Sequence, residues 1–221
     1  MEIHPIAHFH SDFNEKFGIP RQSCLIPEID GTIIFTPAYR DPDYLRELEG
    51  FDYLWLIWGF SSNKHMVRGS TVRPPRLGGN RRVGIFASRS PYRPNPLGLS
   101  SVKIQKIEQT SNNGIVIHVK GGDLQNGTPI YDIKPYLEFT DSHTNIRNGY
   151  VDTEEWKKLE VIFSAEATQK YNSAEKVYIS NILEQDPRPH YHNDPEKTYK
   201  MNLKNKEIHF MIKDGVCMVI E

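Results

Sequence analysis

The residues best suited to chemistry lie in a long stretch that lacks acidic side chains. From Tyr53 to Ile107 there is no Asp or Glu, although the whole chain is balanced, with 27 Lys+Arg against 28 Asp+Glu. The planar fork of arginine suits phosphate and carboxylate groups. We therefore expect a surface that binds a polyanion, a carboxylate-bearing cofactor or both, the alternative being a solvated loop. The ten basic residues are Lys64, Arg68, Arg73, Arg76, Arg81, Arg82, Arg89, Arg93, Lys103 and Lys106.

Two further segments carry candidate polar groups. Asn95 lies between Pro94 and Pro96, which restrict its backbone. Its amide is either held toward a planar base edge or serves as a turn residue that caps its own loop. Beyond the turn predicted at Asn126-Gly127, a strand would place Asp132 and Lys134 on one face and Tyr131 on the other. That pair is either functional or a surface ion pair of little energetic value.

The other candidates are weaker. His4, His8 and His10 alternate, as do His190 and His192, but nothing else has the spacing of metal ligands, so we expect no metal site. Arg188 lies between two prolines, as Arg93 lies beside Pro94, which hints at a shared partner. The usual nucleotide-binding and hydrolase motifs are absent.

Composition limits the class of protein. The chain has 221 residues, 38% hydrophobic and 25% charged, which is typical of one large or two small globular domains. Two cysteines without a CxxC motif indicate a reducing compartment, and the N-terminus lacks a signal-peptide pattern. We expect a cytoplasmic protein without a membrane span.

Short strands must position these residues in the first two thirds of the chain. A helix is expected near Pro42–Leu48, with Asp41 as its N-cap. Many short strands with little helix predict a barrel or a sandwich. The strands are expected at Glu2–Phe9, Thr32–Phe35, Tyr53–Phe60, Arg82–Ala87, Leu99–Ile107 and Ile115–Lys120.

The last third predicts a small α+β domain after a polar linker at Thr140–Gly149. A helical region is expected over Ala165–Glu184, with a possible break at Asn172–Ser173, where Asn172 and Glu175 have capping-box spacing. Asp214-Gly215 predicts a hairpin. We place the domains at residues 1–145 and 146–221. The strands are expected at Leu159–Phe163, Thr198–Leu203, Glu207–Ile212 and Val216–Ile220.

Five motifs occur in an order that resembles the TrmO (TsaA/YaeB) family of S-adenosylmethionine-dependent tRNA methyltransferases. They are Pro20-Arg21-Gln22, TVRPPRLGGN, FASRSPYRPNPLG, NGTPIYDIKPY and QDPRPHY. The resemblance implies a mainly β protein, with a small closed β-barrel of non-Rossmann type and a small α+β C-terminal domain. It also implies a homodimer that methylates N6 of threonylcarbamoyladenosine next to the tRNA anticodon.

The resemblance assigns cofactor contacts to residues of this sequence, and the basic residues described above would supply the RNA contacts. Relatives often carry His-Gln where Ser61-Ser62 stands, and Asp where Asn126 stands. The tRNA anticodon stem-loop would meet Arg73, Arg76, Arg81, Arg82, Arg93, Lys134 and Arg188. Contacts to S-adenosylmethionine would come from Pro20, Arg21, Gln22, Ser61, Ser62, Arg89, Leu99, Asn126, Gly127, Thr128 and Pro129.

For the chemistry, Asp132 or Tyr131 would accept or polarise the N6 proton, and Asn95 would orient the base edge. Arg93 or Lys134 would pair with the threonyl carboxylate. The alternatives are a non-catalytic RNA-binding barrel and a metal-dependent hydrolase that uses the N-terminal histidines.

Overall fold

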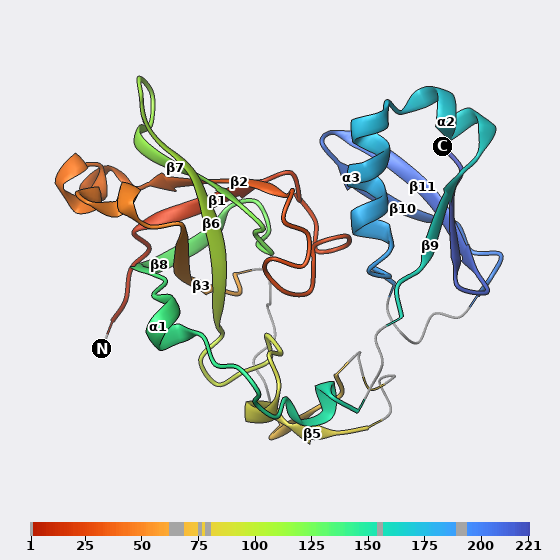
Figure 1. Cartoon of the computed structure of the whole chain (residues 1–221), viewed down its shortest axis with the longest axis horizontal. Coiled ribbons are helices and arrows are strands. Elements are labelled where there is room, and N and C mark those ends of the chain that lie inside the picture. Colours follow the sequence, from red (N-terminus) through yellow and green to blue (C-terminus); the bar gives the residue numbers. More distant parts are fainter. Residues whose placement is uncertain (1, 62–68, 75–76, 78–80, 154–156, 189–193) are drawn as a thin grey trace.

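The computed structural model describes residues 2–61, 69–74, 77, 81–153, 157–188 and 194–221. Figure 1 shows a β-barrel, a separate sheet covered by helices, and a small lobe around β5. The fold is mainly β, as the sequence predicts. No helix within the described ranges is long and apolar enough to cross a membrane.

Six antiparallel strands close into a barrel in the order β1-β2-β7-β6-β3-β8, with β8 returning to β1. Alternate residues point inward, because side chains in a strand alternate between its faces. Phe9, Ile33, Leu54, Leu56 and Ile117 fill the interior. Closure leaves no free sheet edge. The strands are β1 (Ala7–Ser11), β2 (Asp30–Phe35), β3 (Tyr53–Gly59), β6 (Leu97–Thr110), β7 (Gly114–Lys120) and β8 (Thr128–Pro135).

The C-terminal part is a four-stranded sheet in the order β10-β11-β12-β9, packed against helices. Only β12 and β9 run parallel; the other pairs are antiparallel. A short helix α1 (Glu138–Asp141) precedes this part. Its elements are β9 (Glu160–Phe163), α2 (Ala165–Lys170), α3 (Ser173–Leu183), β10 (Tyr199–Leu203), β11 (Lys206–Lys213) and β12 (Val216–Val219).

Two predictions for this part are confirmed. The helical region breaks after Lys170, and Asn172 and Glu175 form a reciprocal capping box that starts α3. Asp214 and Gly215 both have positive φ, at 49° and 82°, and they join β11 to β12. Those dihedrals match the twist of a tight hairpin.

The segment between β1 and β2 belongs to the C-terminal core. Phe13, Ile26 and Ile29 are almost fully buried and lie in the same cluster as Leu183 and Phe210. Figure 1 shows this segment leaving the barrel toward α3. The two parts are therefore joined by shared hydrophobic burial as well as by the chain connection at residues 142–159.

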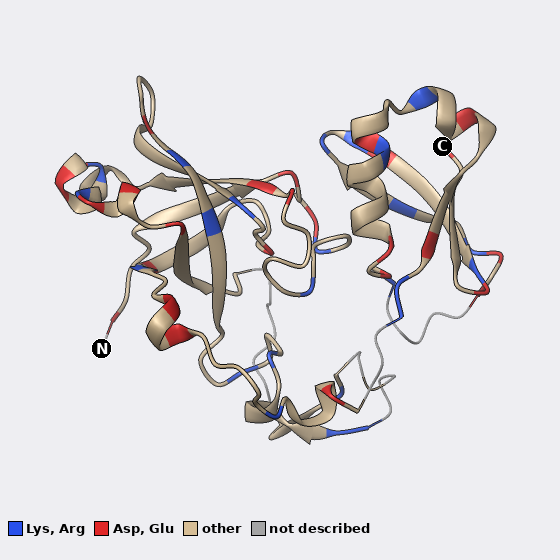
Figure 2. Ribbon diagram, in the orientation of Figure 1, with Lys and Arg blue, Asp and Glu red and all other residues tan. Residues whose placement is uncertain are grey.

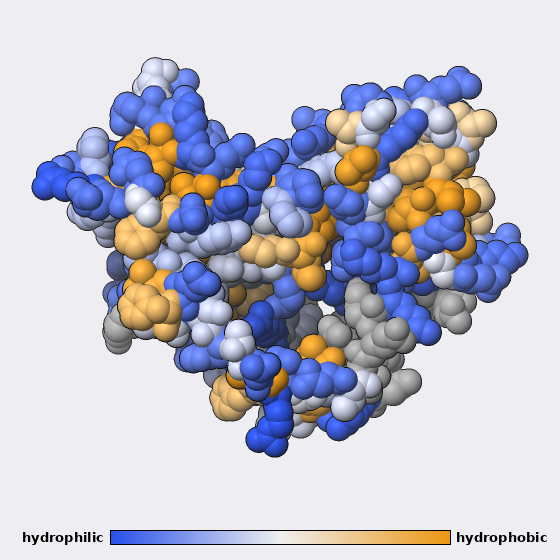
Figure 3. All heavy atoms as spheres, in the orientation of Figure 1, coloured by the Kyte–Doolittle hydropathy of each residue, from blue (hydrophilic) through white to orange (hydrophobic). Residues whose placement is uncertain are grey.

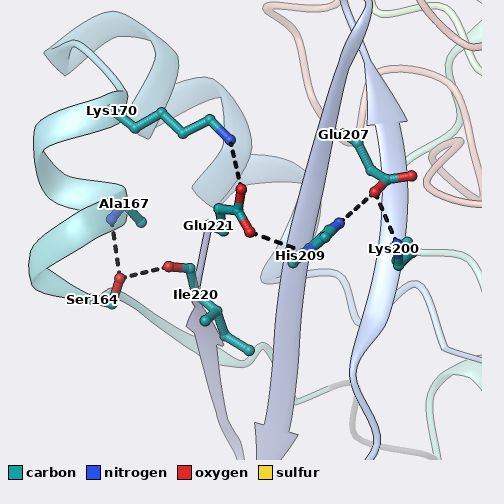
Figure 4. A network of polar contacts seen from close by, with 8 residues as sticks. All are labelled: Ser164, Ala167, Lys170, Lys200, Glu207, His209, Ile220 and Glu221. Carbon is teal, nitrogen blue, oxygen red and sulfur yellow. Dashed lines mark hydrogen bonds and ion pairs between the residues drawn. The ribbon is translucent and has the colours of Figure 1, made fainter.

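The chain end is fixed by a polar network on the C-terminal sheet (Figure 4). Ser164 Oγ donates to the Ile220 carbonyl at 2.7 Å and accepts from the Ala167 N–H at 3.0 Å, so it caps α2 and holds the chain end together. Glu221 lies 3.9 Å from Lys170 and 3.6 Å from His209.

Three element predictions need correction. The first strand is Ala7–Ser11, not Glu2–Phe9; Pro5 cannot donate to a sheet. Pro42–Leu48 is not an α-helix: a 3₁₀ turn capped by Asp41 covers Pro42–Leu45, and Glu47 then takes a φ of 69°. Only Val83–Gly84 of the Arg82–Ala87 strand forms as β5, paired with β4 (Thr71–Val72), and Ile85–Ala87 is a 3₁₀ turn.

Candidate cofactor and RNA site

Three barrel strands bring distant candidates into one row. Ile57 on β3 pairs with Leu99 on β6 and with Asp132 on β8. A hollow of about 370 Å³ lies on this outer face, and Lys134 also lines it. The Trp55 indole donates to Asp141 Oδ2 at 2.7 Å across one wall. The full lining is Trp55, Ile57, Leu99, Lys134, Thr140, Asp141 and His143.

The three residues singled out on β8 lie close together. Lys134 Nζ is 3.0 Å from Asp132 Oδ2, and both side chains are largely exposed. A bulge between Ile57 and Trp58 shifts the register beside Tyr131. The Tyr131 ring lies over Gly59, where an added Cβ would come within 2.8 Å of it. Asp132 is thus an open carboxylate beside a cation, and Tyr131 is held by close packing.

The loop at Pro20–Cys24 lies against β6 and the residue that follows β7. Arg89 Nη1 donates to Gln22 Oε1. The Cys24 N–H donates to the Gly121 carbonyl at 2.8 Å, and its Sγ lies 3.5 Å from the Ser101 carbonyl. The structure therefore brings together Gln22 and Arg89, which are 67 positions apart.

A carboxylate that the sequence analysis missed stands beside this loop. Trp58 Nε1 donates to Ser100 Oγ at 2.9 Å, and Ser100 Oγ donates to Asp123 Oδ1 at 2.6 Å. Burial raises the pKa of Asp123 to about 6, although Ser100, the Ser23 backbone N–H and Arg89 all act to lower it. Asp123 thus connects the barrel interior to the Gln22 loop and to Arg89.

The predicted turn at Asn126-Gly127 is present, and a hydrogen bond to β1 holds it in place. The Gly127 N–H donates to the Phe9 carbonyl at 2.8 Å, and Gly127 has a φ of 79°. Thr128 Oγ1 donates to the Gln125 carbonyl at 2.7 Å. Asn126 Nδ2 donates to Asn14 Oδ1 at 2.9 Å, so part of its amide is already used. Pro129 follows at the start of β8.

Asp186 and Arg188, in the described part of the QDPRPHY motif, contact the same loop. Arg21 Nη2 donates to the carbonyls of Asp186 and Arg188, each at 3.1 Å. Arg188 in turn binds Asp186 through Nε at 2.9 Å and Nη2 at 2.8 Å. The guanidinium fork of Arg188 is thus occupied by a carboxylate within its own loop.

The other RNA candidates lie on or near the β5 lobe. Figure 2 shows Lys and Arg in the segments next to β5. Arg82 Nη1 donates to Thr71 Oγ1 at 2.9 Å, whereas Arg93 Nη1 donates to the Ser88 carbonyl at 2.6 Å. The side chains of Arg73, Arg81, Arg82 and Arg89 are exposed.

Asn95 and Ser61 are also exposed, so both are accessible to a ligand. The Asn95 carbonyl accepts the Leu97 N–H at 2.7 Å, which supports the turn interpretation for its backbone and leaves its amide open to either role. Ser62, Arg76, Lys64, Arg68, His190 and His192 lie outside the described residues.

The class follows from the architecture. A closed antiparallel barrel with an appended α+β unit is unlike the doubly wound sheet of Rossmann-type enzymes. Residues 8–142 match the family model of the tRNA-methyltransferase O N-terminal domain, and residues 156–221 match that of the TrmO C-terminal domain. The chain belongs to the TrmO family.

Individual relatives agree with this assignment. The tRNA (adenine(37)-N6)-methyltransferase of Escherichia coli K12 is 35% identical over 223 residues, which cover 97% of this chain and 94% of the relative. A putative S-adenosylmethionine-dependent methyltransferase RcsF from Pseudomonas aeruginosa PAO1 is 35% identical over 94% of this chain and 91% of its own. The crystal structure of TrmO from Pseudomonas aeruginosa superposes with a TM-score of 0.78 at 28% identity, covering 100% of this chain and 98% of that one.

Proposed function

We propose that this protein is an S-adenosylmethionine-dependent tRNA methyltransferase that acts on N6 of adenine 37, with threonylcarbamoyladenosine as the substrate nucleoside. One observation carries the proposal: a polar cluster of Gln22, Arg89 and Asp123 lies next to the acid-free stretch with its exposed arginines. The polar cluster suits a small zwitterionic cofactor, and the exposed arginines suit a phosphate backbone.

The residues present fit S-adenosylmethionine. This molecule carries a carboxylate, two cationic centres and ribose hydroxyls, and it supplies an electrophilic methyl group when bound. Arg89 offers a cation for the carboxylate, and Asp123 offers a half-buried anion. The Gln22 and Asn126 amides offer donors and acceptors. The remaining contacts would come from Pro20, Arg21, Ser61, Ser62, Leu99, Gly127, Thr128 and Pro129.

The main difficulty of the reaction is the nucleophile. The N6 of a carbamoylated adenine is amide-like, so its lone pair is delocalised, and attack becomes easier when its proton is removed or tightly bound. We assign that proton to Asp132 or to Tyr131, which are neighbours on β8. Alignment of the two reactants supplies most of the rest of the acceleration.

The substrate's threonyl carboxylate needs a cation, and we assign Lys134 or Arg93 to it. Lys134 lies 3.0 Å from Asp132, so binding of the threonyl carboxylate would draw Lys134 away from Asp132 and leave this carboxylate open to the N6 proton. Asn95, rigidly held between two prolines, would orient the base edge.

The tRNA anticodon stem-loop would lie on the arginine surface. Arg73, Arg76, Arg81, Arg82 and Arg93 would hold its phosphates. Arg188 would act differently from an open arginine, because Asp186 occupies its fork. Through the bonds of Arg21 to that loop, Arg188 would also stabilise the cofactor segment.

The assembly and domain division complete the proposal. We assign the cofactor and the catalytic groups to residues 1–145, and tRNA support to residues 146–221. We also propose a homodimer, with the exposed Leu97 and Leu99 of β6 near the subunit contact, and a cytoplasmic location.

Calorimetry with S-adenosylmethionine alone tests the cofactor assignment. Arg89→Ala is expected to weaken binding about tenfold or more, since it removes a charge-assisted contact. Arg46→Ala is the matched control, because Arg46 pairs with Asp43 on the surface, outside the proposed site. Equal affinities for the wild type and Arg89→Ala would contradict the assignment of Arg89.

A further inference from the structure

The aromatic ring of Phe86 is exposed to solvent among the arginines near β5. Phe86 is 79% exposed, and it lies in the 3₁₀ turn Ile85–Ala87 directly after β5. An exposed apolar side chain is unremarkable when it is alone on a polar surface. Phe86 is not alone, because Tyr92 nearby in the sequence is 48% exposed.

The ring is presented on a braced turn. Ile85 anchors the turn in the protein interior at 5% exposure, and Ser88 Oγ donates to the Ile85 carbonyl at 2.9 Å. Arg93 Nη1 donates to the carbonyls of Ile85 and Ser88. Its guanidinium carbon lies 5.9 Å from the centre of the Phe86 ring. The ring is therefore held at low entropic cost and has a cation beside it.

The charged residues of the segment that carries the ring have one sign. Arg81, Arg82 and Arg89 are exposed in the same segment, and no acid occurs between Tyr53 and Ile107. Figure 3 shows hydrophobic atoms among hydrophilic ones over the β5 lobe. A second copy of this segment would be repelled by it, because like charges would meet. Aromatic rings interleaved with arginines suit a nucleic acid with unstacked bases.

We propose that Phe86 is a stacking platform for an unpaired base of the tRNA anticodon loop, while Arg81 and Arg82 hold the flanking phosphates. Bases of a duplex already stack on one another, so only a loop or a single strand can offer a free base face. The proposal rests on the proposed function, which supplies the RNA. It adds the contact that distinguishes a loop from a helical stem.

The test measures binding of an anticodon stem-loop RNA to Phe86 variants, with a fully paired RNA hairpin stem of equal charge as the comparison. Phe86→Ala is expected to weaken stem-loop binding about tenfold, as loss of one stacked base does. Phe86→Leu should lose as much, because leucine has no aromatic face, and Phe86→Trp should retain binding. Binding of the paired stem should change less than twofold in every variant.

Tyr44→Ala is the matched control. Tyr44 is 63% exposed in another 3₁₀ turn, but Asp41, Asp43, Glu47 and Glu49 surround it in sequence. Stem-loop binding by this variant should equal that of the wild type. The Phe86→Trp variant adds a direct readout, because a base stacked on the new indole should quench its fluorescence relative to wild-type protein.

Three results would overturn the proposal: unchanged stem-loop affinity in Phe86→Ala, full retention in Phe86→Leu, or conversion of Phe86→Ala to a monomer, which would assign the ring to a subunit contact. The failure of the proposed function is separable. A wild-type protein that transfers no methyl group, yet binds the stem-loop in a Phe86-dependent way, would remove the enzyme and keep the platform.

Discussion

The Ser100 hydroxyl donates a 2.6 Å hydrogen bond to Asp123 Oδ1, and this contact links the barrel interior to the loop at Pro20–Cys24. On the inner side, Ser100 accepts the Trp58 indole N–H at 2.9 Å. On the outer side, Asp123 accepts the Ser23 backbone N–H and lies near Arg89. One half-buried carboxylate thus orders two segments that we assign to S-adenosylmethionine.

Asp123→Asn is expected to raise the stability of the protein at pH 7 and to weaken its binding of S-adenosylmethionine. The pKa of Asp123 is about 6 in the folded protein, against 3.8 for an ordinary aspartate. The folded state therefore holds this proton more tightly than the unfolded state, so the free energy of unfolding falls as pH rises from about 4 to about 6. The neutral variant should lose that decline and be more stable at pH 7 by about 1–3 kcal/mol.

The same variant should bind S-adenosylmethionine at least tenfold more weakly at pH 7, and its affinity should not change between pH 5 and pH 7. Urea unfolding and calorimetry over this range measure both effects. Asp30→Asn, which removes a surface partner of Lys120, is the control. An Asp123→Asn protein with the wild-type pH profile would show that the carboxylate charge has no role.

Gly98→Ala should destabilise the barrel, because a Cβ at Gly98 would come within 2.2 Å of the Trp58 ring. Displacing that ring would also strain the Trp58–Ser100 hydrogen bond. We expect a loss of about 1–3 kcal/mol in the free energy of unfolding. Gly84→Ala is the control, since a Cβ there meets no atom within 4 Å. Equal stability of the two variants would contradict the close packing at Gly98.

Turnover of two β8 variants should identify the group that handles the N6 proton. If Asp132 is the base, Asp132→Asn should lower kcat by about 10²–10⁴-fold with unchanged cofactor affinity, because proton transfer supplies an effect of that size. Tyr131→Phe should then be nearly wild type; the reverse pattern assigns the role to Tyr131. Wild-type kcat in both variants would remove both residues from the chemistry.

Salt dependence should separate phosphate contacts from other arginine roles. Arg82→Ala should weaken tRNA binding and reduce the slope of log K against log salt concentration by about one. Arg188→Ala should change the slope less, since its fork is bound to Asp186, and should instead weaken cofactor binding through Arg21. Filter binding from 50 to 300 mM salt measures the slopes. An Arg82→Ala slope equal to that of wild type would exclude a phosphate contact.

Local features of the fold could be predicted from the sequence, because local residues determine them. The capping box at Asn172 and the hairpin at Asp214-Gly215 depend on a few neighbouring residues, and both are confirmed. The burial of Phe13 in the C-terminal core could not be predicted, since it depends on a packing partner more than 160 positions away, such as Leu183.

The candidate site also has features that local sequence predicts and features that depend on long-range packing. Arginine enrichment is visible in composition, and the motifs carry the family resemblance. Asp123 was missed because its significance arises only when β3, β6 and the loop at Pro20–Cys24 meet. The row of Leu99, Ile57 and Asp132 depends on β6 and β8 being the neighbours of β3, and the local sequence of one strand does not show which strands it pairs with. A signal for Asp123 was available in its position three residues before the Asn126-Gly127 turn.

The most direct test of the central claim is nucleoside mass spectrometry after incubation of the purified protein with S-adenosylmethionine and a tRNA that carries threonylcarbamoyladenosine. We predict one added methyl group on that nucleoside, dependent on S-adenosylmethionine, and no product from the same tRNA with unmodified adenine 37. A protein that binds both S-adenosylmethionine and the tRNA but leaves the nucleoside unmethylated would contradict the assignment as a methyltransferase.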